Sequence, residues 1–257
     1  MKVAILPDES AIGGVAADAI EALYARKPGA VLGLATGSSP MPIYRELIER
    51  HRQGRISFAQ GSAYALDEYV GLPPEHPESY RMVIRTSIAD HVDFPAGAVH
   101  GPQGWAEDLD AAAADYDRSI REAGGVDLQI LGIGSDGHIA FNEPGESFAS
   151  RTHRGFLTAQ TIRDNARFFD GDVAQVPTQC LTQGIGTIME ARALVLVATG
   201  ENKAEAVRQM VEGPVSASWP ATILQFHRDA LVLVDPAAAS RLERADHYRE
   251  IWEAEQR

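Results

Sequence analysis

The sequence of residues 31–52 is Val31-Leu-Gly-Leu-Ala-Thr-Gly-Ser-Ser-Pro-Met-Pro-Ile-Tyr-Arg-Glu-Leu-Ile-Glu-Arg-His-Arg52, which joins a short apolar run to a small-residue loop and a helical pattern. The apolar run at 31–35 shows no polar alternation, as is typical of a strand buried on both faces. The helical pattern follows at 42–52. A strand, a loop and a helix in this order predict half of a βαβ unit, and therefore a parallel sheet.

The same alternation recurs along the chain. Further strand-like apolar runs occupy residues 3–6, 63–66, 128–133, 194–198 and 231–234, and helical patterns occupy residues 15–24, 111–122, 203–211 and 237–252. We therefore expect a Rossmann-like α/β fold with a mainly parallel central sheet and helices on both faces. No linker, low-complexity tract or repeat divides the 257 residues, which predicts one catalytic domain over residues 1–257.

Residues 155–177 form the least regular segment, with three phenylalanines, several aspartates and arginines, and no sustained apolar period. Two interpretations are equally open at this stage. The segment is either a mobile flap over a site or an ordinary excursion at the rim of the sheet.

The composition favours small-molecule chemistry. A formal net charge of −13 argues against nucleic acid or an anionic membrane as the main partner, because both attract an excess of Lys and Arg. Cys180 is the only cysteine, which excludes an internal disulfide and a cysteine-rich metal site and favours a reducing compartment. The start of the chain has too short an apolar run for a signal peptide, and no stretch approaches the roughly 18 apolar residues of a membrane span. We expect a cytoplasmic protein.

Ligands of open α/β sheets bind beyond the carboxyl ends of the strands, so the junctions after the apolar runs are candidate sites. Gly37, Ser38 and Ser39 end the first junction and could cradle a phosphate with backbone amides and hydroxyls, although such a loop is also a routine turn and helix cap. Lys203 lies in the first helical turn after Gly200, where its charge opposes the helix dipole. A bound anion would resolve that conflict, and a solvated lysine is the alternative.

Two junctions carry acid–base groups. Asp67 and Glu68 follow the run at 63–66, and partial burial there can raise a carboxyl pKa enough for proton abstraction. The alternative is that Asp67 caps a helix or turn and Glu68 is solvated. Asp136, His138 and Glu143 follow the run at 128–133, and an imidazole flanked by carboxylates suits proton transfer to and from a sugar oxygen. A metal site is disfavoured, because the spacing lacks the helical His-x-x-x-His register and no second ligand cluster accompanies it.

Taken together, these segments resemble the glucosamine-6-phosphate deaminase family. The resemblance runs in order through residues 32–40, 66–80, 131–144, 150–153, 165–169, 176–177 and 200–204. The discriminating element is Gly137-His-Ile-Ala-Phe-Asn-Glu-Pro144. The 6-phosphogluconolactonases of the same fold share the Asp-Gly-His core but continue differently, and they lack the Asp-Glu-Tyr-Val-Gly segment found at 67–71.

The resemblance implies a deaminating aldose-to-ketose isomerisation without a cofactor or a metal. His138, supported by Asp136 and Glu143, would open the pyranose ring. Asp67 would then take the proton from C2 to give an enolamine and deliver a proton to C1. Hydrolysis of the resulting ketimine would release fructose 6-phosphate and ammonia.

The resemblance also implies how the substrate, a small-molecule sugar phosphate, is held. Gly37, Ser38 and Ser39 would bind the phosphate together with Arg167 and Lys203, which supplies the local cations that an acidic chain needs for an anionic ligand.

One departure from the family concerns regulation. Glu146, His153 and Gly155 stand where the allosteric hexameric members would have a serine, an arginine and a lysine. We therefore expect no activation by an acidic N-acetylated sugar phosphate. A homo-oligomer is neither implied nor excluded. The rival interpretations are a lactonase, a deaminase of another amino sugar, and a sugar-phosphate sensor without turnover.

Overall fold

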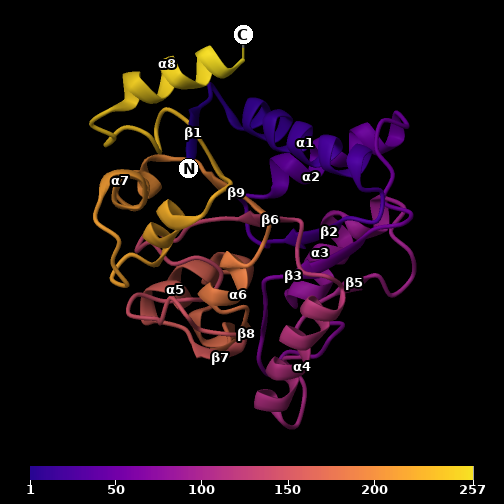
Figure 1. The fold of residues 1–257 in the computed structure, drawn as a ribbon. Helices are drawn as coiled ribbons and strands as arrows, with labels where there is room; N and C mark the ends of the chain where they lie inside the picture. The colour runs from indigo at the N-terminus through magenta and orange to yellow at the C-terminus, as the bar shows by residue number, and fades with distance from the viewer. Residues whose placement is uncertain (257) are drawn as a thin grey trace.

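The central feature of the computed structural model, which describes residues 1–256, is a seven-stranded sheet with the order β1-β10-β9-β6-β2-β3-β5 (Figure 1). Every neighbouring pair in it is parallel. Its strands are β1 (Lys2–Ile5), β2 (Val31–Leu34), β3 (Ser62–Ala65), β5 (Val99–His100), β6 (Leu128–Leu131), β9 (Ala193–Ala198) and β10 (Ala230–Val234). The predicted α/β fold is confirmed, and each of the six predicted apolar runs forms a strand.

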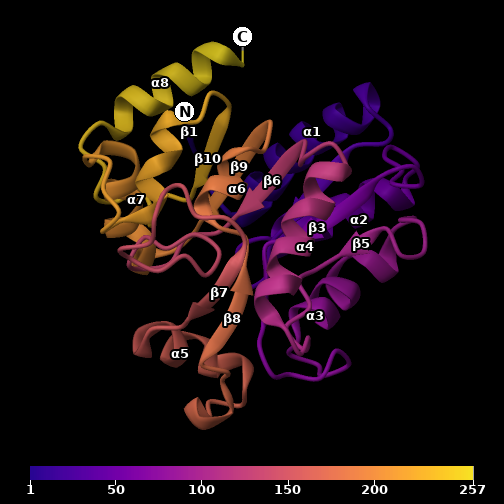
Figure 2. The ribbon, with the colours of Figure 1, turned by 60° about the horizontal axis from the view of Figure 1, so that its bottom comes forward.

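Helices cover both faces of this sheet. The α-helices within residues 1–256 are α1 (Glu9–Arg26), α2 (Met41–Arg52), α3 (Tyr80–Ser87), α4 (Leu109–Glu122), α5 (Ala159–Asn165), α6 (Ile185–Met189), α7 (Ala204–Glu212) and α8 (Ala245–Glu255), although α5 lies beside the smaller sheet described below (Figure 2). α1 and α2 pack together on one side of the strands, and α4 lies on the other side (Figures 1 and 2). In the part of the chain that the structure describes, no helix has the length and apolar character needed to cross a membrane.

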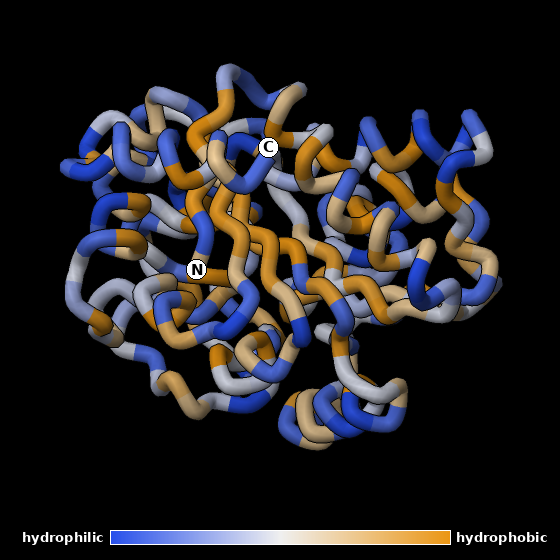
Figure 3. Tube along the Cα trace, turned by 45° about the horizontal axis from the view of Figure 1, so that its top comes forward, coloured by the Kyte–Doolittle hydropathy of each residue, from blue (hydrophilic) through white to orange (hydrophobic). Residues whose placement is uncertain are grey.

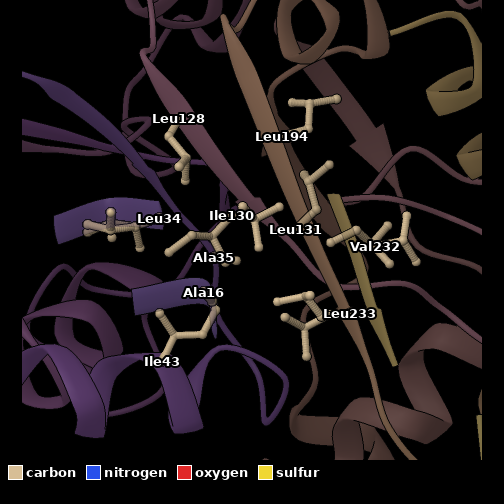
Figure 4. Packing of buried hydrophobic residues seen from close by; sticks show 14 of the residues in the cluster. Ala16, Leu34, Ala35, Ile43, Leu128, Ile130, Leu131, Leu194, Val232 and Leu233 are labelled. Atoms are coloured by element: carbon tan, nitrogen blue, oxygen red, sulfur yellow. The ribbon is translucent and has the colours of Figure 1, made fainter. Parts of the chain in front are cut away.

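The core lies between the sheet and its helices. Apolar segments are concentrated in the central strands, whereas hydrophilic segments lie towards the periphery (Figure 3). Leu34, Ile130 and Val232 are fully buried. Ala16 of α1 and Ile43 of α2 meet on one side of this layer (Figure 4). Burial on both faces explains why these strands are continuous apolar runs that the sequence reveals.

A second, smaller sheet was not predicted. It is antiparallel, has the order β4-β8-β7, and comprises β4 (Asp67–Tyr69), β7 (His153–Phe156) and β8 (Gln179–Thr182). The chain passes from β3 into β4 through Leu66 alone, so the catalytic candidate Asp67 begins a strand of a different sheet. β4 and β7 are short and contain polar residues, which is why no apolar run marks them.

Two predicted elements differ from the structure. The helix predicted at 237–252 is wrong in its first half, because α8 begins only at Ala245. The Asp235 carboxylate accepts hydrogen bonds from the backbone N–H groups of Ala238 and Gly200, which stabilises a turn instead. The segment at 155–177 is also more regular than expected. It contains the end of β7, the helix α5 and two 3₁₀ turns, Ala166–Phe168 and Val173–Gln175. These pieces are too short to show an apolar period.

Candidate active site

Four strands that are neighbours in the sheet, β9, β6, β2 and β3, carry the four predicted junctions at their carboxyl ends. The junctions gather around a cavity of about 760 Å³. The cavity is lined by all the predicted site residues except Asp136 and Glu143, namely Gly37, Ser38, Ser39, Asp67, His138, Arg167 and Lys203. Asp136 and Glu143 lie beside the imidazole of His138. The tertiary structure therefore brings the whole predicted set together.

Asp67 is the buried carboxyl group of the cavity, with 6% of the residue exposed. Burial raises its pKa well above the ordinary value, and the negative charge of the neighbouring Glu68 adds to the effect. A carboxylate with a raised pKa is a stronger base than an ordinary aspartate, which suits proton abstraction from carbon.

Glu68 is not solvated, contrary to the alternative considered from the sequence. It is 3% exposed, and its carboxylate accepts hydrogen bonds from the backbone N–H groups of Tyr69 (2.9 Å), Tyr80 (2.8 Å) and Arg81 (2.9 Å). Tyr80 and Arg81 begin α3, so the negative charge lies at the positive end of that helix. The pKa of Glu68 is raised, because the effect of burial exceeds the lowering effect of these three backbone donors. Glu68 thus fixes α3 to β4 beside Asp67.

The imidazole of His138 is held from one side by two carboxylates. Its Nδ1 atom lies 2.7 Å from Asp136 Oδ1 and 3.8 Å from Glu143 Oε2. Burial alone would raise the pKa of Asp136, but the His138 ring and backbone N–H lower it to about 2. Asp136 is therefore ionised at neutral pH, and it orients the ring so that Nε2 is the nitrogen left for proton transfer.

Two glycines make this arrangement sterically feasible. Gly137 has a φ of 84°, and a Cβ atom there would lie 2.7 Å from the Trp219 ring. A Cβ atom on Gly134 would lie 2.3 Å from the ring of His138. Both positions exclude larger residues, so the loop can close tightly around the imidazole.

Asp136, His138 and Glu143 are also the group within residues 1–256 whose geometry could hold a metal ion. One ligand atom from each of them lies within 4.8 Å of the others. Their contacts favour a hydrogen-bonded proton-transfer group instead. Asp136 Oδ1 already contacts the imidazole, and Glu143 Oε1 accepts hydrogen bonds from Thr161 Oγ1 (2.6 Å) and the Thr158 N–H (3.1 Å). A cation bound to the imidazole Nδ1 would have to displace the Asp136 contact.

The other end of the cavity is suited to an anion. Gly37, with a φ of 84°, shapes the loop that carries Ser38 and Ser39 to the start of α2. Lys203 ends a 3₁₀ turn immediately before α7, and burial lowers its pKa. The charges of Asp164 and Asp136 raise this pKa, and the charge of Arg167 lowers it. Within residues 1–256 neither cation forms an ion pair with a carboxylate. Two neighbouring cations at a serine-rich loop, neither of them held in an ion pair within residues 1–256, favour a bound phosphate.

Several residues of the cavity wall were not predicted as site residues. Thr161 and Asn165 of α5 and Tyr80 of α3 all line the cavity. Tyr80 Oη lies 3.3 Å from Tyr69 Oη, and Asn165 Nδ2 donates to Tyr69 Oη at 2.9 Å. Their side chains belong to common residue types, and only the positions of α5 and the start of α3 at the cavity single them out.

Glu146, His153 and Gly155, where we expected no effector pocket, form contacts within the protein. His153 Nε2 lies 3.3 Å from Glu146 Oε1, and His153 Nδ1 lies 2.8 Å from the carbonyl oxygen of Arg151. A Cβ atom on Gly155 would lie 3.0 Å from Cys180 Sγ. A carboxylate therefore occupies the neighbourhood in which an anionic effector would need cations.

Comparisons with known proteins identify the family of this chain. A family model described as glucosamine-6-phosphate isomerases/6-phosphogluconolactonase matches residues 9–233. A glucosamine-6-phosphate deaminase of Mycolicibacterium smegmatis is 64% identical over 254 residues, covering 99% of this chain and 97% of the relative. The corresponding protein of Streptomyces coelicolor is 54% identical over 252 residues, covering 98% of this chain and 97% of the relative.

The solved structures show the same pattern. A monomeric glucosamine-6-phosphate deaminase has a TM-score of 0.91 and 41% identity, covering 93% of this chain and 99% of that chain. The 6-phosphogluconolactonase from Trypanosoma cruzi, at 21% identity and a TM-score of 0.77, covers 94% of this chain and 97% of that chain and shows the shared fold alone. The chain therefore belongs to the glucosamine-6-phosphate isomerase/6-phosphogluconolactonase family, in which its curated relatives at 51–64% identity are glucosamine-6-phosphate deaminases.

Proposed function

We propose that this chain is a glucosamine-6-phosphate deaminase, which converts glucosamine 6-phosphate and water into fructose 6-phosphate and ammonia. The observation that carries the proposal is one cavity with three chemically distinct parts. They are a buried carboxyl group, Asp67, an imidazole held by two carboxylates, His138, and the pair of cations Arg167 and Lys203. The deaminase relatives support this assignment over a lactonase.

The phosphate group anchors the substrate in this proposal. Arg167 and Lys203 neutralise its charge, and the backbone N–H groups and hydroxyls at Gly37, Ser38 and Ser39 bind its oxygens. Because these groups lie in the cavity that Asp67 and His138 also line, an anchored sugar has both proton-transfer groups within the same enclosure.

Ring opening is the first chemical step. His138 transfers a proton from the C1 hydroxyl to the ring oxygen, which breaks the C1–O5 bond and leaves an aldehyde at C1. The ionised Asp136 stabilises the imidazolium that forms during this transfer, and Glu143 adds a second negative charge near the same nitrogen. The aldehyde is required because it acidifies the hydrogen on C2.

Asp67 then acts on carbon. Its carboxylate takes the C2 proton, the electron pair forms the C1–C2 double bond of an enolamine, and the π pair of the C1 carbonyl moves to its oxygen, which accepts a proton. Return of a proton to C1 yields a ketimine at C2. Water adds to the ketimine, the C–N bond breaks, and ammonia leaves from fructose 6-phosphate. The carbonyl and the amino group stabilise the intermediate, so we propose that neither a metal nor an organic cofactor takes part.

The same reasoning gives the partners and the compartment. The partner is a small-molecule sugar phosphate, and the net charge of −13 argues against nucleic acid. Cys180 is a buried, free thiol, which is consistent with the reducing cytoplasm. We also propose that residues 155–177 act as a flap, because Thr161, Asn165 and Arg167 from this segment line the cavity.

The decisive experiment measures ammonia and fructose 6-phosphate released from glucosamine 6-phosphate in the presence of a chelator, with wild type and Asp67→Asn. Equal release of both products by wild type, and loss of release in the variant, would support the reaction and the base. Binding of the sugar phosphate without turnover would favour a sensor instead. Hydrolysis of 6-phosphogluconolactone by wild type would favour the lactonase.

A further inference from the structure

Helix α5 contacts a neighbour of each proton-transfer group, Glu143 beside His138 and Tyr69 on the strand of Asp67, through side chains one helical turn apart. Thr161 Oγ1 donates a hydrogen bond of 2.6 Å to Glu143 Oε1, and the backbone N–H of Thr158 donates to the same oxygen at 3.1 Å. Asn165 Nδ2 donates a hydrogen bond of 2.9 Å to Tyr69 Oη. Thr161 and Asn165 therefore lie on the same side of α5, and this side faces Glu143 and Tyr69.

The Thr161 contact sets the orientation of Glu143. The other oxygen, Oε2, is buried, lies 3.8 Å from His138 Nδ1, and has no hydrogen-bond partner within residues 1–256. Because Oε1 is held by two donors from the start of α5, the helix determines where Oε2 lies relative to the imidazole. Moving α5 away would leave Glu143 without these donors and free to turn from His138.

The Asn165 contact acts on the strand that carries Asp67. Tyr69 is the third residue of β4, which begins at Asp67, and its hydroxyl also lies 3.3 Å from that of Tyr80, a residue of the cavity wall. Tyr69 packs edge-on against Phe169, which follows α5 in the chain and is 4% exposed. The end of α5 and β4 are thus joined by a hydrogen bond and by a buried aromatic contact.

The same segment carries the candidate phosphate ligand Arg167. Arg167 lies in the 3₁₀ turn Ala166–Phe168, which continues directly from α5, and its charge acts on Lys203 across the cavity. The carboxylate of Asp164 on α5 attracts Lys203, whereas the charge of Arg167 repels it. A phosphate bound by both cations adds two attractions, which hold the Arg167 turn and the helix α5 before it against the cavity.

We propose that Thr161 and Asn165 are positioning residues, through which binding of the substrate's phosphate group places Glu143 and the Asp67 strand for proton transfer. This inference rests on the proposed deaminase function. Part of the binding energy of the phosphate is then used to position the groups that act on C2. The phosphate thereby activates the site as well as anchoring the sugar.

The test separates the phosphate from the sugar. Glucosamine without phosphate is supplied as substrate, inorganic phosphite is added as a separate dianion, and ammonia release is measured. Wild type should release ammonia slowly from glucosamine alone, and saturating phosphite should raise kcat/KM by about 10²-fold. Thr161→Val and Asn165→Leu should lose most of this activation. Thr161→Ser, which keeps the hydroxyl, should retain it.

Kinetics with the intact substrate provide an independent readout. Thr161→Val should lower kcat for glucosamine 6-phosphate by about 10- to 100-fold with little change in KM, since it removes the hydrogen bond to Glu143 and leaves the phosphate-binding cations in place. The matched control is Thr86→Val, which removes a hydroxyl bonded within α3 and outside the cavity wall. It should leave both parameters unchanged.

The outcomes distinguish this inference from the function on which it rests. Wild type that does not release ammonia from glucosamine 6-phosphate contradicts the function itself. Wild type that uses glucosamine 6-phosphate but shows no response to phosphite with glucosamine overturns only the positioning role. Full phosphite activation in Thr161→Val and Asn165→Leu would overturn it as well, and loss of activity in Thr161→Ser equal to that in Thr161→Val would reduce Thr161 to a structural residue.

Discussion

The carboxyl groups of Asp67 and Glu68 are adjacent in β4 and both are buried, yet they serve opposite sides of the strand. Asp67 lines the cavity, whereas Glu68 accepts three backbone hydrogen bonds at its own strand and at the start of α3. Alternation of side chains along a strand produces this division. The Asp67 carboxyl group is left for chemistry. Glu68 holds the start of α3 beside it, and the negative charge of Glu68 raises the pKa of Asp67.

Asp67→Asn should abolish deamination and stabilise the fold. The raised pKa means that the folded state binds a proton more tightly than the unfolded chain, so wild-type stability falls as pH rises from the ordinary value of 3.8 through the raised pKa. The asparagine carries no charge, and at pH 7 we expect the variant to be more stable by about 1–3 kcal/mol. Urea unfolding at several pH values measures this. A stability difference that persists unchanged below pH 3.8 would contradict the assignment.

Glu68→Gln should shift the pH profile of kcat/KM. Removing the negative charge lowers the pKa of Asp67 towards its ordinary value, so the base stays ionised at lower pH and the acid limb moves in that direction. Burial remains the larger cause of the raised pKa, which makes the shift partial. The lost acceptor should cost about 1–3 kcal/mol of stability. Glu75→Gln removes an exposed carboxylate and should leave the profile unmoved.

Arg167→Ala and Lys203→Ala should each raise KM for glucosamine 6-phosphate by about 10- to 100-fold, because each removes a charge-assisted hydrogen bond to phosphate. Turnover of unphosphorylated glucosamine should change little. Arg154→Ala removes an exposed arginine that bonds Gln179 and provides the control. Equal losses with the two substrates would show that these cations do not bind the phosphate.

Glucosamine 6-phosphate saturation should be hyperbolic, and N-acetylglucosamine 6-phosphate should not activate the enzyme. Glu146 lies 3.3 Å from His153, so a carboxylate faces the place where an anionic effector would need positive charge. Initial rates measured with and without the N-acetylated sugar phosphate check this. Sigmoidal kinetics that the compound relieves would refute the expectation.

Much of the fold could be predicted because its central strands are buried on both faces. Residues 128–131 and 230–234 are almost entirely apolar, so they stand out without knowledge of their partners. The short elements could not be predicted in this way. The polar strand β4 gains its backbone partners from β8, more than a hundred residues later, and α5 has only seven residues.

The sequence by itself determined the layers of the fold and the junctions that meet at one edge of the sheet, because apolar periodicity and the carboxyl-end rule are local or topological. It also supplied the acid–base candidates Asp67 and His138. Only the tertiary structure decided how these residues are used. Burial beside Glu68 raises the pKa of Asp67, and Thr161 reaches Glu143 because α5 docks over the cavity. Such effects depend on desolvation and on contacts between distant segments, which do not exist until the chain has folded.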